Sequence, residues 1–382
     1  MRKNVLFVIE SLCGGGAEKV LTTLLKHLDK SKYNITLCTI INTGNYIDEV
    51  KPYVNYTSVI SLPHNQSILD RIWYTIKYKL VYKLLPISWV YKLFIPKDND
   101  IEIAFCEGFT TKLMSKSSNK KAKKIAWVHI DLKFNPWSQR LGIYRNIKEE
   151  TLTYSKFDSI ITVSKTVKES FKEIYGQAEK IVTIYNPIDV HEIRQKGKEY
   201  IEGYNKDVMN LVTVGRLVPQ KGYDILLQIV VRLKNEGYKF ILRILGEGTE
   251  WKELLHYKEQ NELQDYVELM GFKKNPYPYI ANSDLFVCSS RSEGYSLVIA
   301  ESLVLGIPVL STYCSGPNEL LDEGKYGKLV ENGDHGSGLY EGLKQFLNNK
   351  ELLEEYRQKA IERGNFFSLT KVINEIEEIL NQ

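Results

Sequence analysis

One short stretch of the chain, residues 285–311, restricts the fold more than any other. The apolar run Leu285–Ser289 has the length of a buried strand, and the apolar-rich segment Leu297–Leu305 has that of a helix. Gly306 ends this helix, and Val309–Ser311 is predicted to be the next strand. A strand, a helix and a second strand in this order form a parallel crossover. The chain is therefore expected to build a parallel sheet covered by helices, with its functional groups at the carboxyl edge.

The N-terminal half repeats this alternation of short apolar runs and amphipathic segments. It predicts strands at Val5–Ile9, Ile35–Ile41, Ile101–Cys106, Lys124–His129, Ser159–Ser164 and Ile181–Tyr185, and helices at Ala17–Leu28, Ile68–Leu85, Thr110–Ser117, Gln139–Tyr154 and Lys165–Tyr175. This order indicates a doubly wound parallel sheet. A length of 382 residues suits two such domains. We place their boundary after residue 188, because Pro187 favours an extended turn, and we expect Val190–Val208 to be an exposed connection.

Two carboxylates, Glu293 and Glu301, bracket the start of the helix at Leu297–Leu305. A helix N-terminus offers free backbone N–H groups and a partial positive charge, which suit a phosphate. Carboxylates on either side can accept hydrogen bonds from the hydroxyls of a ribose or a sugar ring. The alternative is a capping acid followed by an exposed helix position, but Glu301 lies within an apolar stretch, where a carboxylate needs a partner. The pattern favours a nucleotide-sugar.

A second element indicates the same chemistry. The apolar run Leu211–Val214 is predicted to be a strand, a glycine turn follows it, and Tyr223–Lys234 has a helical pattern. The turn carries Arg216 and Lys221. Arg can bind two phosphate oxygens at once and Lys adds a point charge, although both could also be solvated loop cations.

These motifs occur in a characteristic order. Gly215-Arg-(x)4-Lys-Gly222 is followed by Gly246-Glu-Gly248, by Gly271-Phe272 and by the Glu-x7-Glu element. The set resembles the C-terminal half of a family 4 glycosyltransferase, a retaining enzyme of the GT-B fold. The resemblance implies two Rossmann-like, doubly wound domains that face a cleft. It places the acceptor on residues 1–188 and the nucleotide-sugar on residues 189–368, and it suggests that a final helix in residues 369–382 packs back on the first domain.

The resemblance also assigns roles to particular residues. His129 ends the strand Lys124–His129, at the carboxyl edge, and resembles the family's histidine under the transferred sugar; a satisfied structural histidine is the alternative. Glu293 would hold the sugar and steer its anomeric carbon, and Asp131 would contact the acceptor. The expected donor-binding residues are Gly15, Gly16, Arg216, Lys221, Gly246, Phe272, Glu293, Gly294, Tyr295, Ser296, Leu297 and Glu301.

The sequence argues against a metal or an additional cofactor. The first glycine turn, Gly14–Gly16, lacks the third glycine of a dinucleotide-binding fingerprint and the Gly-Lys-Ser/Thr of a P-loop. The Asp-x-Asp motif Asp98–Asp100 precedes a predicted strand, at the wrong edge for a ligand, and is better explained as a turn. The five cysteines include no Cys-x-x-Cys pair, which favours reduced thiols.

The charge of the chain is unevenly distributed. Residues 1–188 hold 28 Lys and Arg against 17 Asp and Glu, a net charge of +11, whereas residues 189–382 have a net charge of −7. From Arg71 to Lys97 there are six basic residues and no acidic one, interspersed with Trp, Tyr and aliphatic residues. This composition is typical of a helix in a membrane interface, and a solvated helix is the alternative. Nucleic acid is disfavoured because no such motif accompanies the patch.

We therefore expect a cytoplasmic enzyme, peripheral on the inner face of the cell membrane. It would transfer a hexose or N-acetylhexosamine, preferably from a UDP-sugar, to a lipid-linked saccharide in bacterial capsule or exopolysaccharide assembly. A signal peptide and a membrane-spanning helix are not expected. Three alternatives stay open: a protein acceptor, a non-catalytic partner subunit of this fold, and a nucleotide-sugar 2-epimerase.

Overall fold

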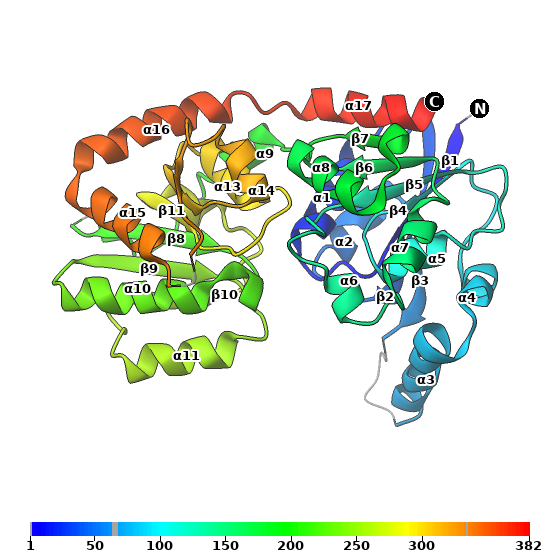
Figure 1. Cartoon of the computed structure of the whole chain (residues 1–382), viewed down its shortest axis with the longest axis horizontal. Helices are drawn as coiled ribbons and strands as arrows, with labels where there is room; N and C mark the ends of the chain where they lie inside the picture. Colours follow the sequence, from blue (N-terminus) through cyan, green and yellow to red (C-terminus); the bar gives the residue numbers. More distant parts are fainter. Residues whose placement is uncertain (1, 63–67, 206, 334) are drawn as a thin grey trace. The chain divides into compact units, whose positions relative to one another are not determined.

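The computed structural model describes residues 2–62, 68–205, 207–333 and 335–382. The chain divides into two compact units (Figure 1). The first unit comprises Met1–Pro187 with Thr370–Gln382, and the second comprises Ile188–Leu369. The divisions fall within two residues of the boundaries expected from the sequence. Both units are α/β, with helices packed on a parallel sheet, which agrees with the expected Rossmann-like architecture.

The sheet of the first unit has seven parallel strands in the order β3-β2-β1-β4-β5-β6-β7. The strands are β1 (Lys3–Ile9), β2 (Tyr33–Asn42), β3 (Asn55–Ser61), β4 (Ile101–Ala104), β5 (Lys123–Val128), β6 (Ser159–Thr162) and β7 (Ile181–Thr183). The order reverses between β1 and β4. Ligands of open α/β sheets bind outside the carboxyl ends of the strands at such a switch point.

The helices of the first unit differ from the sequence predictions at several places. They are α1 (Gly16–His27), α2 (Ile47–Val50), α3 (Ile68–Lys79), α4 (Ile87–Phe94), α5 (Phe109–Met114), α6 (Trp137–Arg140), α7 (Ile147–Tyr154) and α8 (Lys165–Tyr175), with short turns at η1 (Lys51–Tyr53) and η3 (Ala178–Lys180). The single helix predicted over Gln139–Tyr154 is wrong. Gly142 adopts a left-handed φ of +67° after α6, and Asn146 caps the new helix α7 by accepting a hydrogen bond from the Glu149 amide. The helix predicted over Ile68–Leu85 changes to a π-turn, η2 (Leu80–Leu84).

The sheet of the second unit has six parallel strands in the order β10-β9-β8-β11-β12-β13. They are β8 (Met209–Val214), β9 (Phe240–Leu245), β10 (Val267–Gly271), β11 (Leu285–Cys288), β12 (Val309–Thr312) and β13 (Lys328–Val330). The helices are α9 (Val190–Lys196), α10 (Tyr223–Asn235), α11 (Trp251–Gln260), α12 (Tyr277–Ala281), α13 (Leu297–Val304), α14 (Ser315–Leu320), α15 (Ser337–Asn348) and α16 (Lys350–Gly364). Here the strand order reverses between β8 and β11, so the predicted crossover β11-α13-β12 starts at the switch point.

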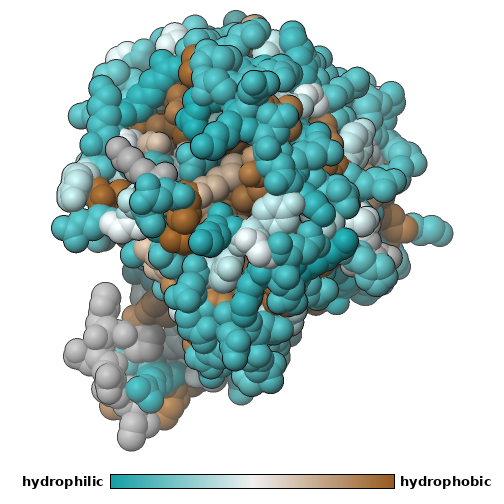
Figure 2. Space-filling view, turned by 90° about the vertical axis from the view of Figure 1, so that its left-hand side faces the viewer, coloured by the Kyte–Doolittle hydropathy of each residue, from teal (hydrophilic) through white to brown (hydrophobic). Residues whose placement is uncertain are grey.

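Residues after the first-unit boundary form a helix rather than the connection expected over Val190–Val208. Asp189 caps α9 by accepting a hydrogen bond from the Glu192 amide at 2.8 Å, and Ile193 is buried. The cap and the packing of Ile193 stabilise this short helix. The side of the second unit that faces the viewer in Figure 2 is mostly hydrophilic, with small apolar areas between the polar side chains.

The C-terminal helix α17 (Leu369–Asn381) belongs to the first unit. Figure 1 shows it in red beside the strands of that unit. Glu377 accepts hydrogen bonds from the Lys32 ammonium at 2.6 Å and from the Asp29 amide at 3.2 Å. Lys3 and Lys123 donate to carbonyl groups of the last turn, where a helix C-terminus attracts cations. The chain thus returns to the first unit, as the resemblance suggested.

Candidate functional site

The candidate site of the second unit lies where β8 and β11 end. After β8, the turn η4 (Pro219–Lys221) brings Lys221 toward the loop that follows β11. Gly222 has a φ of +66°, and a Cβ atom there would lie 2.2 Å from the Ser289 carbonyl oxygen. Only glycine allows the two loops to approach this closely. The close approach places Lys221 and Glu293, 72 positions apart in the sequence, in direct contact.

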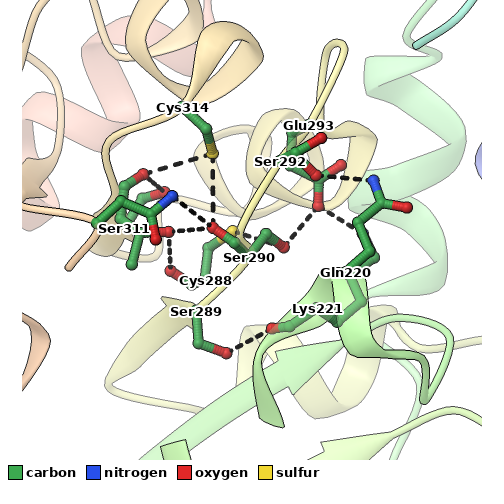
Figure 3. Close-up of polar contacts among 11 residues, drawn as sticks. Gln220, Lys221, Cys288, Ser289, Ser290, Ser292, Glu293, Ser311 and Cys314 are labelled. Carbon is green, nitrogen blue, oxygen red and sulfur yellow. Dashed lines mark hydrogen bonds and ion pairs between the residues drawn. The ribbon is translucent and has the colours of Figure 1, made fainter. Parts of the chain in front are cut away.

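Glu293 and Lys221 form a largely buried ion pair (Figure 3). The Lys221 Nζ lies 2.5 Å from Glu293 Oε1, and the two side chains are 17% and 9% exposed. Burial alone would lower the pKa of Lys221, but the adjacent Glu293 carboxylate raises this pKa above its ordinary value. The Ser290 hydroxyl donates a second hydrogen bond to the same Oε1 atom at 2.7 Å. Lys221 is therefore a fixed cation at neutral pH, and Glu293 has one oxygen engaged by the protein.

Further hydrogen bonds hold the two loops together. The Gln220 amide donates to the Ser292 carbonyl at 2.7 Å, and the Ser289 hydroxyl donates to the Lys221 carbonyl at 2.8 Å, as Figure 3 shows. Sequence reasoning did not single out Ser290, whose role depends on its contact with Glu293. The only available signal was the run of serines after β11. These contacts hold the loop after β8 against the loop after β11 and so bring Lys221 and Glu293 together.

The start of helix α13 offers unused hydrogen-bonding groups. Ser296, the residue before the helix, has a left-handed φ of +67°, and its side chain forms no capping hydrogen bond. Within the described part of the chain, the buried hydroxyls of Ser292 and Ser296 have no hydrogen-bond partner. Gly294 and Tyr295 are buried just before the helix, and Leu297 is its first residue. The N–H groups of a helix's first turn have no partner within the helix, and together with the buried hydroxyls they are suited to an anionic oxygen-rich ligand.

Glu301 lies one turn further along α13 and is only 2% exposed. The hydroxyl of Tyr277, from α12, lies 3.4 Å from Glu301 Oε1. A carboxylate buried among apolar residues is costly unless it is hydrogen-bonded, so Tyr277 contributes to keeping it in place. The sequence suggested that Glu301 needed a partner or a ligand. It gave no indication of Tyr277, which follows β10 in a stretch rich in proline and tyrosine.

The expected donor residues Arg216, Gly246 and Phe272 lie at the same edge of the second sheet. Arg216 is exposed in the turn after β8, and Phe272 is half-buried directly after β10. Gly246 follows β9 with a φ of +145°, and a Cβ atom there would lie 1.9 Å from the carbonyl oxygen of Gly215. Gly246 thus permits close packing of two strand ends, a structural requirement that is compatible with a ligand nearby.

In the first unit, His129 lies directly after β5. Its Nε2 atom is 2.9 Å from the Phe105 carbonyl oxygen, which requires the proton on Nε2 and leaves the lone pair on Nδ1. Burial lowers the pKa of His129 to about 3, so the ring is neutral. Sequence reasoning missed Glu107, whose Oε1 accepts from the backbone amides of His129 and Ile130. Burial raises the pKa of Glu107 to about 7.

The other predicted residues of the first unit have different environments. Asp131 is fully buried and accepts hydrogen bonds from the Lys133 amide and the Ser170 hydroxyl, so an acceptor contact would first require this loop to open. Gly15 precedes α1 and Gly16 begins it, at the carboxyl edge of β1. Asp100, of the Asp-x-Asp motif, accepts from the Asn4 amide at the amino end of β4. Among the residues that the structure describes, no cluster of His, Cys, Asp and Glu could hold a metal ion.

Comparison with known proteins relates both units of the chain to glycosyltransferases. The family described as "Glycosyl transferases group 1" matches residues 198–363, and "Glycosyltransferase Family 4" matches residues 14–192. The N-acetylgalactosamine-N,N'-diacetylbacillosaminyl-diphospho-undecaprenol 4-alpha-N-acetylgalactosaminyltransferase of Campylobacter jejuni is 31% identical over 97% of both chains. HepE of Anabaena, solved with UDP and glucose, superimposes with a TM-score of 0.77 at 18% identity, over the whole of both chains. Sucrose-phosphate synthase of Thermosynechococcus elongatus has a TM-score of 0.75 at 13% identity, covering 100% and 99% of the two chains.

The two parallel-sheet units and their structural neighbours define the GT-B fold of glycosyltransferases. The chain belongs to glycosyltransferase family 4. The fold, the family and the enzyme class expected from the sequence are thereby confirmed.

Proposed function

We propose that this glycosyltransferase transfers a hexose or N-acetylhexosamine, with retention of configuration, from a UDP-sugar to a lipid-linked saccharide during assembly of a bacterial surface polysaccharide such as capsule or exopolysaccharide. The observation that carries the proposal is the full-length similarity to the Campylobacter enzyme, whose name specifies a diphospho-undecaprenol-linked acceptor. The complex of HepE with UDP and glucose supports the choice of UDP.

The second unit supplies the groups that a nucleotide-sugar requires. Lys221, Arg216 and backbone amides at the start of α13 would bind the diphosphate, on which negative charge grows as the glycosidic bond breaks. Lys221 is positioned by its contact with Glu293 and by the hydrogen bond from the Ser289 hydroxyl to its carbonyl group, and Ser290 in turn holds Glu293. We propose no metal ion and no additional cofactor, because these cations can neutralise the leaving group themselves.

The two glutamates would recognise the two sugars of the donor. Glu301 would accept hydrogen bonds from the ribose hydroxyls. Glu293 would accept from hydroxyls of the transferred sugar and orient its anomeric carbon. In the first unit, neutral His129 would act as a hydrogen-bond acceptor through Nδ1 rather than as an acid. The departing phosphate would take the acceptor's proton during attack on the same face, which retains the configuration.

The membrane would be contacted through the first unit. On α3, Leu69 is 77% exposed and Trp73 is 68% exposed, and Trp89 and Leu93 are exposed on α4. The six basic residues between Arg71 and Lys97 accompany them. Exposed aromatic and aliphatic side chains among cations favour the interface of an anionic bilayer. Among the described residues, no helix combines the length and apolarity that a membrane span needs. A peripheral position on the cytoplasmic face is therefore part of the proposal.

A thermal-shift panel of UDP-, GDP- and ADP-sugars tests the donor. A ligand at about 100 times its Kd adds about 2.7 kcal/mol to the stability of the folded state. A shift from UDP-sugars in the wild type that is lost in Glu301→Ala would support the donor assignment. No shift from any nucleotide-sugar on folded protein would contradict it and favour a partner subunit.

Transfer itself is tested with radiolabelled UDP-sugars and an undecaprenyl-diphosphate-linked saccharide. Retention predicts that NMR of the product shows the α-anomer when the donor is α-linked. Labelled protein in place of labelled lipid would indicate a protein acceptor, and donor interconversion without an acceptor would indicate an epimerase.

A further inference from the structure

The switch point of the first sheet carries side chains that the proposed mechanism leaves without a role. Glu10 follows β1 directly, and Phe109 begins α5 shortly after β4. Because the order of strands reverses between β1 and β4, both residues lie at the carboxyl edge where open α/β sheets bind ligands. The expected acceptor residue, Asp131, is buried at the end of a different strand.

A row of aromatic rings leads to this edge. Tyr82 packs on Phe109 with ring centroids 4.5 Å apart, and Tyr78 packs on Tyr82 at 4.7 Å. Tyr74 continues the row at 6.1 Å from Tyr78. We call these four rings the tyrosine ladder. Tyr74, Tyr78 and Tyr82 are spaced four residues apart, so that they share one side of the helix. The last of them lies in the π-turn η2, a feature that is frequent at functional sites.

The ladder ends at a carboxylate. The Tyr82 hydroxyl donates a hydrogen bond to Glu10 Oε1. Burial raises the pKa of Glu10, and the hydrogen bond from Tyr82 opposes this rise. Tyr78 is 37% exposed, so a ligand can reach its ring.

This combination selects one class of ligand. A carboxylate accepts hydrogen bonds from hydroxyl groups and repels phosphate. Aromatic faces pack against the C–H surface of a sugar ring, and ligand sites in general combine aromatic surface with a few fixed polar groups. The exposed apolar residues Leu69 and Trp73 lie on the same helix as Tyr74 and Tyr78, which suits an acceptor with one saccharide end and one lipid end.

We propose that Glu10 and the tyrosine ladder form the subsite for the saccharide part of the acceptor. The proposal rests on the proposed transferase function. It replaces Asp131 by Glu10 as the acidic residue that contacts the acceptor. Tyr82 positions the Glu10 carboxylate, and Tyr78 provides the accessible ring.

Saturation-transfer difference NMR tests the subsite without requiring turnover. The probes are methyl α-D-N-acetylgalactosaminide and methyl α-D-glucoside at millimolar concentration. The wild type is expected to transfer saturation to the sugar ring protons. Glu10→Gln keeps an oxygen that can accept from Tyr82 but loses the charge, so it should weaken saccharide binding about 10-fold or more. Tyr78→Ala should weaken it about 2- to 10-fold, whereas Tyr78→Phe retains the ring and should bind nearly as the wild type.

Two controls separate this proposal from the proposed function. Tyr200→Ala removes a tyrosine that is 87% exposed in the second unit and should leave saccharide binding unchanged. The thermal shift with UDP-sugar should be unchanged in every variant, which also shows that the variants fold. If Glu10→Gln and Tyr78→Ala bind saccharide as well as the wild type, or if the wild type binds neither glycoside, the subsite is refuted. If the wild type gives no UDP-sugar shift, the donor assignment fails instead.

Discussion

The ion pair between Lys221 and Glu293 allows the energetics of the second-unit site to be tested directly. The charges lie 2.5 Å apart, and both side chains are mostly buried. Removing one partner of such a pair leaves the other charge without compensation and costs about 3–5 kcal/mol. Because some solvent still reaches Lys221, we expect Lys221→Met to lower the free energy of unfolding by about 3 kcal/mol. Glu293→Gln keeps an acceptor for Ser290 and should cost about 2 kcal/mol.

The double variant Lys221→Met/Glu293→Gln has neither charge left. The decrease in its free energy of unfolding should be smaller than the sum of the decreases in the two single variants, with a coupling energy of about 2 kcal/mol. Hydrogen exchange of the β8 and β11 amides measures the free energy of opening of the second unit alone, so that unfolding of the first unit does not contribute to the measured value.

The pH dependence of the coupling provides a second readout. The pKa of Lys221 is raised in the folded state, because Glu293 outweighs the effect of burial. The lysine's contribution is therefore complete below its ordinary pKa of 10.5 and is lost only as the pH rises through the raised value. Because Lys221 stays protonated at both values, its coupling energy with Glu293 should be equal at pH 7 and pH 9. A coupling below about 0.5 kcal/mol at pH 7 would mean that solvent screens the pair like an exposed one, which would refute the reasoning.

Three further predictions concern other positions. The pKa of His129 is lowered to about 3, so the unfolded state binds a proton before the folded state does as the pH falls. The free energy of unfolding should therefore decrease below about pH 6, and it should decrease less in His129→Gln. Urea titrations at pH 4 and pH 7 measure this difference. The pKa of Glu107 is raised to about 7, so its contribution to the free energy of unfolding falls as the pH rises from about 4.5 to 7. Glu107→Gln should remove this contribution to the pH dependence in the same titrations. Gly246→Ala places a Cβ atom 1.9 Å from the carbonyl oxygen of Gly215, at a φ of +145° that suits only glycine. The substitution should lower the free energy of unfolding by about 3 kcal/mol or more, which faster hydrogen exchange of the β9 amides would show.

Local patterns predicted much of the fold because glycine and proline mark the ends of buried strands. The crossover at residues 285–311 agrees with β11, α13 and β12 within one residue. Strand β3 (Asn55–Ser61) was missed because it is an edge strand, and its polar, half-exposed residues lack a clear apolar pattern. The helix predicted over Gln139–Tyr154 was wrong because a cap at Asn146 starts a new helix, which outweighs the periodicity.

For the candidate site, too, the sequence revealed local motifs but not the contacts that the fold creates. Lys221 and Glu293 were selected from spacing within short motifs, and the structure brings them into contact. Ser290 and Glu107 were not selected, because the role of each depends on a side-chain geometry that the sequence does not show: Ser290 on the loop conformation that turns it toward Glu293, and Glu107 on the backbone amides of His129 and Ile130. Residues that support a functional group are identified by their tertiary contacts, and a single sequence does not show those contacts.

The ion pair has a consequence for the order of recognition at the donor site. Glu293 Oε1 lies 2.5 Å from the Lys221 Nζ atom and compensates its charge. A diphosphate that binds Lys221 competes with this carboxylate, and by doing so it frees Glu293 Oε1 to accept a hydrogen bond from the donor sugar. We therefore predict that Glu293→Gln binds UDP at least as tightly as the wild type, since no carboxylate competes for the lysine, but transfers sugar more than about 10-fold more slowly. Titration calorimetry with UDP and a transfer assay measure the two effects. Weaker UDP binding in Glu293→Gln would show instead that the carboxylate positions Lys221 for the phosphate, and the competition would not exist.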